Sequence, residues 1–268
     1  SIYTEAVQKL KDNEKGEQEV EEINRKLDAC KDKTLTQLWK ETRQWSLDYF
    51  ETIYTRVGSR YDRYYFEGEC LSGVERAREA VKKGVLKEDG GAIIFDGKPY
   101  GLDTRVFVNS LGLPTYEAKE LALAAMEKSE FGTLNRIIHV VGPEQASFFK
   151  VTFKVEELLG MLKPGVQHHL VYGWVKLKHG KMSSRSGNVV LGEWLLNEVK
   201  QSIYTILEKS DTPQAGKDRI AEKAAVAAVK YSFLRVSTER EIAFDLAESI
   251  NFQGDSGPYL QYTYARAK

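Results

Sequence analysis

Two apolar, strand-like runs flank a helical pattern in the middle of this chain, and their order limits the folds that it can adopt. Residues 136–142 (RIIHVVG) and 168–175 (HHLVYGWV) are the two runs, and the helix between them begins near Phe148 and closes by Pro164. We predict that the first run is a buried strand. Strands alternating with helices are typical of an α/β fold, whose ligands bind beyond the carboxyl ends of the strands. The sequence therefore predicts an α/β domain with contacts in the loop after residue 142.

Upstream, apolar and aromatic residues recur mostly every three or four positions between residues 35 and 57. This spacing predicts an amphipathic helix that ends at Gly58, and its aromatic stripe is interpreted as core. Thr34 and Gln37 fit a capping box at its start. The stripe consists of Leu35, Leu38, Trp39, Trp45, Phe50, Ile53, Tyr54 and Val57.

The rest of the chain gives shorter predictions. Residues 1–33 are charged and predict exposed helices around a loop at 13–16. Strands are predicted at 61–67, 91–95 and 106–108. Further helices are predicted at 71–83, from about 115, at 191–209 and at 220–234.

Composition narrows the class of protein. The 268 residues are 42% hydrophobic and 29% charged, and the sequence holds no apolar run near the ~20 residues that span a bilayer. Lys plus Arg and Asp plus Glu number 39 each, which argues against a generally basic nucleic-acid binder. Cys30 and Cys70 form neither a disulfide framework nor a metal spacing, so we expect reduced cysteines, a cytoplasmic protein and no protein-built metal site.

The stretch HGKMSSRSGN at residues 179–188 combines two cations four positions apart with three hydroxyls between glycines. Glycines let a backbone approach a ligand closely, and fixed positive charge suits a polyphosphate. On composition alone a solvated basic turn is the more frequent reading of such a loop. The stretch therefore gains meaning only from what it resembles.

Lys-Met-Ser-Ser-Arg at 181–185 resembles the second signature loop of class I aminoacyl-tRNA synthetases, and Gly-Asn-Val-Val at 187–190 continues as in arginyl-tRNA synthetases. The resemblance implies that this loop neutralises the β,γ-phosphates of ATP as pyrophosphate leaves. It implies catalytic roles for Lys181, Ser183, Ser184 and Arg185. It implies ATP contacts for His169, Tyr172, Gly173, Lys181, Met182, Ser183 and Ser184, with Mg²⁺ accompanying the ATP.

A second set of residues resembles the part of these enzymes that binds the amino-acid substrate. Tyr116 and Glu120 are four residues apart, so they share one helix face. Arginyl-tRNA synthetases carry a Tyr and, four residues on, an acid that holds the substrate guanidinium, followed later by a Gln that lines the pocket. Tyr116, Glu120 and Gln145 match this pattern, although the acid of the family is usually Asp. A Glu carboxylate also accepts two parallel bonds from a guanidinium.

The resemblance covers most of residues 35–268. It implies the second half of a class I synthetase Rossmann-type catalytic domain with a helical insertion, followed by the start of an all-α domain. We predict a helical insertion at 1–90, the Rossmann-type half with the signature loop at 91–210, and the start of a helical anticodon-binding domain at 211–268. Residues 244–245 (FD) and 257–262 (GPYLQY) resemble the part of arginyl-tRNA synthetases where the catalytic domain joins the helical anticodon-binding domain.

The implied activity is that of an aminoacyl-tRNA ligase: ATP-dependent activation of L-arginine and its transfer to tRNA(Arg). The first signature of the class, His-x-Gly-His, does not occur in the 268 residues. We therefore expect a part of a longer chain that is weakly active or inactive alone. Two alternatives stay open, another class I synthetase or a non-catalytic module that binds RNA or protein, and the sequence leaves the oligomeric state open.

Overall fold

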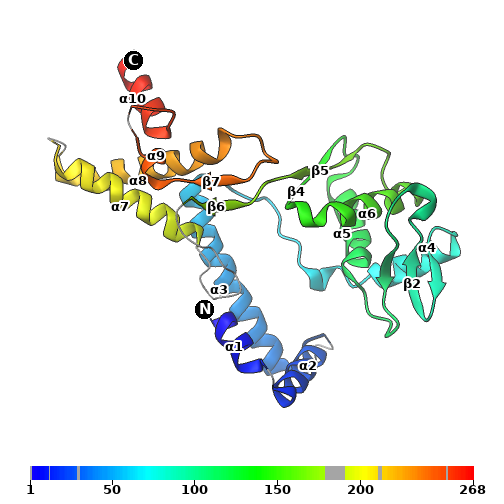
Figure 1. The fold of residues 1–268 in the computed structure, drawn as a ribbon. Helices are drawn as coiled ribbons and strands as arrows, with labels where there is room; N and C mark the ends of the chain where they lie inside the picture. The colour runs from blue at the N-terminus through cyan, green and yellow to red at the C-terminus, as the bar shows by residue number, and fades with distance from the viewer. Residues whose placement is uncertain (1, 12, 29–30, 179–190, 211–212, 252) are drawn as a thin grey trace. The chain divides into compact units, whose positions relative to one another are not determined.

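The computed structural model describes residues 2–11, 13–28, 31–178, 191–210, 213–251 and 253–268 (Figure 1). The chain divides into two compact units. The first consists of residues 1–62, 176–235 and 243–268, and the second of residues 63–175 and 236–242. The domain boundaries predicted at residues 90 and 210 stay predictions.

The second unit contains an antiparallel sheet with the strand order β1-β2-β3 (Lys87–Asp89, Ala92–Phe95 and Arg105–Val108). Helices α4 (Gly73–Lys82) and α5 (Tyr116–Phe131) pack with this sheet, where the apolar side chains are withdrawn from water. The strands β2 and β3 and both helices confirm the predicted elements. The core contains Ala77, Ala80, Leu86, Ile93, Phe95, Phe107, Val108, Ala118, Leu121, Val151 and Val155.

The same unit contains the predicted strand–helix–strand element. Strand β4 (Ile137–Val141) leads through the 3₁₀ turn η3 (Pro143–Gln145) into α6 (Ala146–Leu158), and β5 (Gln167–Val171) returns parallel to β4. His139 lies opposite His169 in this register. This element confirms the α/β prediction, because parallel strands need a crossover connection.

The prediction that β4 is buried is wrong. Ile138 and Val140 are 54% and 59% exposed, and they alternate with partly buried residues. Among the described residues β4 pairs only with β5, and the helix α6 contributes Phe149 and Phe153 beside His139 on the other face. One face of β4 is therefore left uncovered.

The first unit is helical. Its longest helix, α3 (Lys33–Val57), confirms the predicted helix and ends at Gly58, which has φ of 69° in the left-handed region. The predicted capping box is wrong, because the Asp32 carboxylate accepts from the Leu35 amide at 2.9 Å and starts the helix earlier. The prediction of a buried stripe is also wrong. No residue of α3 is buried, and Trp45 is 64% exposed.

Polar contacts connect α3 to its neighbours within this unit. The Arg56 guanidinium lies 2.7 Å from the Glu222 carboxylate of α8 (Gln214–Leu234), and Lys230 donates to the Val57 carbonyl. Helices α7 (Gly192–Glu208) and α8 pack together, and α8 is the alanine-rich helix of the two; both confirm predicted helices. The remaining elements are α1 (Ile2–Leu10), α2 (Glu14–Asp28), α9 (Leu246–Ser249) and α10 (Gly257–Ala267), and the strand pair β6 (Val175–Leu177) with β7 (Ile242–Phe244).

The strand predicted at residues 61–67 is wrong. Residues 61–66 are irregular, and the short 3₁₀ helix η1 (Glu67–Glu69) follows. Local bonds use the backbone groups that a strand would offer a neighbour, since the Phe66 amide donates to the Glu69 carboxylate and the Glu69 amide to the Phe66 carbonyl. This turn places its side chains near α5, as described next.

Candidate functional site

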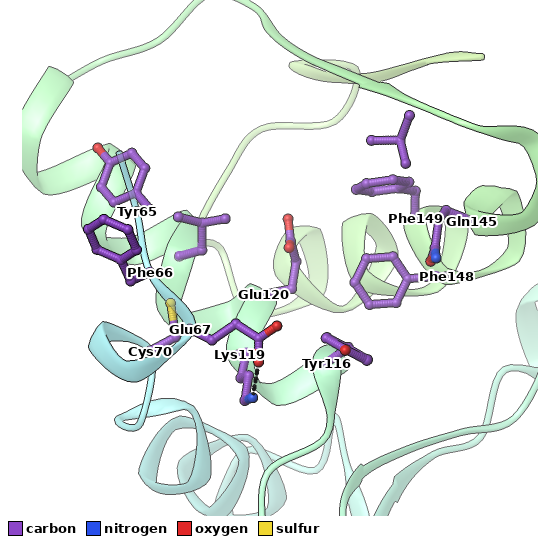
Figure 2. A pocket seen from close by; sticks show the side chains of 12 residues that line it. Tyr65, Phe66, Glu67, Cys70, Tyr116, Lys119, Glu120, Gln145, Phe148 and Phe149 are labelled. Carbon is purple, nitrogen blue, oxygen red and sulfur yellow. Dashed lines mark hydrogen bonds and ion pairs between the residues drawn. The ribbon is translucent and has the colours of Figure 1, made fainter. Parts of the chain in front are cut away.

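A pocket of about 290 Å³ opens in the second unit between η1, α5 and the loop that joins β4 to α6 (Figure 2). Three of its residues are those for which an arginine contact is predicted: Tyr116, Glu120 and Gln145. The predicted residues therefore come together, although they belong to two different segments of the chain. The complete lining consists of Tyr65, Phe66, Glu67, Cys70, Tyr116, Lys119, Glu120, Leu123, Val141, Gln145, Phe148 and Phe149.

Helix α5 supplies Tyr116 and Glu120 from its first two turns. Thr115 precedes the helix with an extended backbone, and its hydroxyl donates to the Val106 and Phe107 carbonyls at 2.7 and 2.9 Å. These bonds attach the start of the helix to β3. The four-residue spacing then sets both side chains on one face, as Figure 2 shows. The Tyr116 ring is 68% exposed at the opening, whereas Glu120 is partly buried.

Gln145 comes from the loop at the carboxyl end of β4. This loop turns at Gly142 and Pro143, and the backbone N–H of Gln145 donates to the Gly142 carbonyl at 3.3 Å. The turn ends β4 and points Gln145 toward the same pocket as Phe148 (Figure 2). A ligand contact at the end of a parallel strand is the arrangement expected of an α/β sheet.

Glu120 provides a partly buried carboxyl group in the pocket. Burial, and then the nearby Glu127, raises the pKa of Glu120 from 4.5 to about 7. The carboxyl therefore changes between its neutral and its ionised form close to neutral pH. A cation placed beside it would favour the ionised form and make a charge-assisted hydrogen bond in surroundings of low polarity.

Two charged residues of the lining were not predicted. Lys119 directly precedes Glu120 on α5. Its ammonium lies 2.5 Å from the Glu67 carboxylate. The same ammonium lies 5.6 Å from the centroid of the Tyr116 ring. The aromatic run at residues 61–67 predicts a strand, and a strand there does not indicate that Glu67 faces α5.

Apolar side chains form the walls of the pocket. Phe148 and Phe149 of α6 are buried and meet edge to face with their centroids 5.0 Å apart. Cys70 lies buried on the opposite wall as a free thiol, and burial is the main cause that raises its pKa. Walls of this kind exclude water and strengthen the attraction between a cation and Glu120.

The described residues predicted to contact ATP lie near the end of β5. His169 is partly buried, its Nε2 lies 3.0 Å from the Val141 carbonyl, and its ring packs 4.7 Å from Phe149. Tyr172 is 44% exposed. A Cβ on Gly173 would lie 2.1 Å from the Arg240 carbonyl oxygen, so packing within the unit itself requires this glycine. An ATP contact by these three stays a prediction.

The signature loop at residues 179–190 lies outside the described residues, and with it the predicted roles of Lys181, Met182, Ser183, Ser184 and Arg185. The chain on either side of it is held within the first unit. The Lys178 amide donates to the Phe244 carbonyl at 2.9 Å, and its ammonium lies 3.2 Å from the Asp245 carboxylate. On the far side, the Tyr49 hydroxyl donates to Glu193 at 2.5 Å.

Within the described part of the chain, no group of three or more His, Cys, Asp or Glu side chains is arranged to hold a metal ion. None of the helices described has the length and apolar character needed to cross a bilayer.

Comparison with known proteins relates the chain to one family. Residues 1–246 match the family described as class I tRNA synthetases (R), catalytic domain. The chain is similar to the arginine–tRNA ligases of Treponema denticola, at 35% identity over 94% of this chain and 43% of that protein, and of Borrelia hermsii, at 31% identity over 99% and 47%. It thus spans less than half the length of these curated relatives.

Solved structures show the same fold. The arginyl-tRNA synthetase of Plasmodium falciparum superposes with a TM-score of 0.76 at 19% identity, covering 94% of this chain and 43% of that one. That of Thermus thermophilus superposes with a TM-score of 0.74 at 22% identity, covering 97% and 50%. The predicted class I synthetase fold is therefore confirmed.

Proposed function

Because the chain belongs to the catalytic-domain family of class I arginyl-tRNA synthetases, we propose that its pocket selects the side chain of L-arginine for an arginine–tRNA ligase. One observation carries this proposal. Tyr116, Glu120 and Gln145, each expected from the resemblance to touch arginine, line the same pocket. The alternative of another class I synthetase would leave this combination without a use.

The chemistry of the pocket suits a guanidinium group. The group is planar and permanently charged, and it presents paired N–H donors to the two oxygens of a carboxylate. Glu120 supplies that carboxylate in apolar surroundings, and Gln145 supplies an amide oxygen as a further acceptor. The Tyr116 ring offers a face on which a cation packs. Glu120 is one methylene longer than the family's usual Asp, which sets its carboxylate further from α5.

Family membership supports the remaining assignments. In this proposal ATP activates arginine to an adenylate, the leaving pyrophosphate meets the cations of the signature loop, and the product passes to tRNA(Arg). Magnesium enters with the ATP. The reaction takes place in the cytoplasm, in accord with the free Cys70 thiol. His169, Tyr172 and Gly173 are proposed to adjoin the nucleotide.

Isothermal titration calorimetry with L-arginine and L-citrulline tests the proposal. Citrulline keeps the shape of arginine but carries a neutral urea in place of the guanidinium. We expect binding of arginine, at least tenfold weaker binding of citrulline, and loss of arginine binding in Glu120→Gln. Equal affinities for both ligands would refute the assignment.

Two further measurements complete the test. Glu79→Gln on the exposed side of α4 is the matched control, since it removes an acid that does not line the pocket, and it should bind arginine normally. Arginine-dependent pyrophosphate exchange then measures activation, for which the sequence predicts a weak or absent signal from this chain alone.

A further inference from the structure

A second buried carboxyl group, that of Glu156, lies behind the pocket without lining it. Glu156 belongs to α6, and its exposed fraction is 0%. Its Oε2 accepts a hydrogen bond from the Gln167 side-chain amide, whereas none of the described residues donates a hydrogen bond to its Oε1. An ionised carboxylate with one oxygen unpaired is strongly disfavoured in a protein interior. The geometry therefore favours a neutral carboxylic acid.

Hydrogen bonds behind Glu156 agree with a neutral group. Gln167 Oε1 lies 3.0 Å from His139 Nε2, so His139 donates, and the Gln167 amide in turn donates to Glu156. The His139 ring packs between Phe149 and Phe153, at centroid distances of 4.9 and 5.0 Å, and burial lowers its pKa. His139 is thus neutral near pH 7 and brings no positive charge to Glu156.

Among the described residues, the charges that act most strongly on Glu156 are negative. Glu120 and Glu127 face it from α5, and Glu157 is its neighbour on α6. Glu157 is itself 3.6 Å from the Lys154 ammonium, and His169 of β5 lies beyond His139. Burial first, and then the charge of Glu120, raises the pKa of Glu156 well above its ordinary value. Burial and the charge of Glu127 raise the pKa of Glu120 only to about 7.

We propose that Glu156 is a positioning residue for the cation pocket: it keeps its proton beside Glu120 and so confines the negative charge of the pair to the carboxylate that lines the pocket. This inference rests on the proposed function, because it concerns the same site. One guanidinium carries one positive charge. If both carboxyls were ionised, one negative charge would stay uncompensated in the apolar interior.

Infrared spectroscopy tests this assignment without any substrate, because a protonated carboxyl has a carbonyl stretch separate from that of a carboxylate. At pH 8 we expect one acid band in the unmodified protein. The band should be lost in Glu156→Gln and retained in Glu127→Gln, the matched control for a neighbouring buried acid. Absence of the band in the unmodified protein, or its loss in Glu127→Gln instead, would overturn the proposal.

The coupling to Glu120 gives a second readout that a purely structural role would not move. Glu120→Gln removes the negative charge that repels an ionised Glu156 most strongly. The acid band of Glu156 should therefore titrate away at lower pH in that variant than in the unmodified protein. An unchanged midpoint would contradict the coupling. If Glu156→Gln does not fold, carbon-13 NMR of glutamate-labelled, unmodified protein replaces it, and one carboxyl carbon should keep its acid shift at pH 8. Because neither readout uses arginine, failure here would leave the proposed function standing.

Discussion

The Lys119 ammonium lies 2.5 Å from the Glu67 carboxylate, and both side chains line the pocket that contains Glu120 (Figure 2). The ion pair joins η1 to α5 across the opening. It places a resident cation 5.6 Å from the centroid of the Tyr116 ring, on which the proposed function packs the guanidinium of arginine. The charge of this pair therefore bears on the affinity of any cationic ligand.

Replacing Lys119 and replacing Glu67 should change the affinity for arginine in opposite directions. Lys119→Gln removes a repulsive charge, so we expect arginine to bind a few fold more tightly, because two unit charges about 6 Å apart in water interact by roughly 0.7 kcal/mol. Glu67→Gln leaves the Lys119 charge unopposed and should weaken binding by a similar factor. Calorimetry on the two variants measures this, and changes of the same sign in both would contradict the electrostatic account.

The pH dependence of arginine binding follows from Glu120. Its pKa is raised to about 7, so most of the carboxyl is neutral at pH 6 and ionised at pH 8. Only the ionised form pairs with a guanidinium, so the association constant should rise about tenfold between these two values of pH. Glu120→Gln should abolish this rise. A flat profile in the unmodified protein would show that Glu120 does not pair with the ligand.

Glu120 also affects stability in the absence of ligand. Its folded-state pKa of about 7 lies above the ordinary value of 4.5, so the folded protein holds this proton more tightly than the unfolded chain does. The stabilising contribution is complete below pH 4.5 and is lost as the pH rises through 7, a change of roughly 3 kcal/mol.

Urea unfolding of the unmodified protein and of Glu120→Gln at pH 4.5 and pH 8 measures this contribution. The difference in unfolding free energy between the two proteins should move in favour of the variant at the higher pH. Parallel curves would mean that Glu120 is not buried as the structure has it.

Gly173 should tolerate no side chain. A Cβ there would meet the Arg240 carbonyl oxygen at 2.1 Å, which is backbone and cannot move aside cheaply. We expect Gly173→Ala to lower the free energy of unfolding by about 2 kcal/mol or more. The control is Gly68→Ala, since a Cβ at Gly68 meets no atom of the described residues within 4 Å and its backbone is not left-handed. Equal thermal stability of the two variants would contradict this packing.

Local patterns in the sequence predict two of the three pocket elements, α5 and the loop after β4, but not η1. The i, i+4 spacing of Tyr116 and Glu120 fixes their common face on any helix, and the strand before Gln145 fixes the end of the sheet at which it lies. That the two segments share a pocket depends on tertiary packing, and only the resemblance to a family suggested it.

Other features could not be read from local patterns. Glu67 sits in an aromatic run with high strand propensity, yet turn bonds around Glu69 override that propensity. The aromatic stripe of α3 has the period of a buried face, but burial depends on a partner surface that periodicity does not reveal. Glu156 resembles an ordinary helical acid, and only the packing of α5 against α6 makes it a buried neighbour of Glu120.

The central claim is that the Glu120 carboxylate receives the guanidinium of arginine, and a crystal structure with L-arginine tests it most directly. We predict that two guanidinium nitrogens lie within hydrogen-bond distance of the two Glu120 oxygens, with Tyr116 and Gln145 beside them. Arginine bound outside this pocket, or bound with its α-carboxylate directed toward Glu120, would contradict the claim.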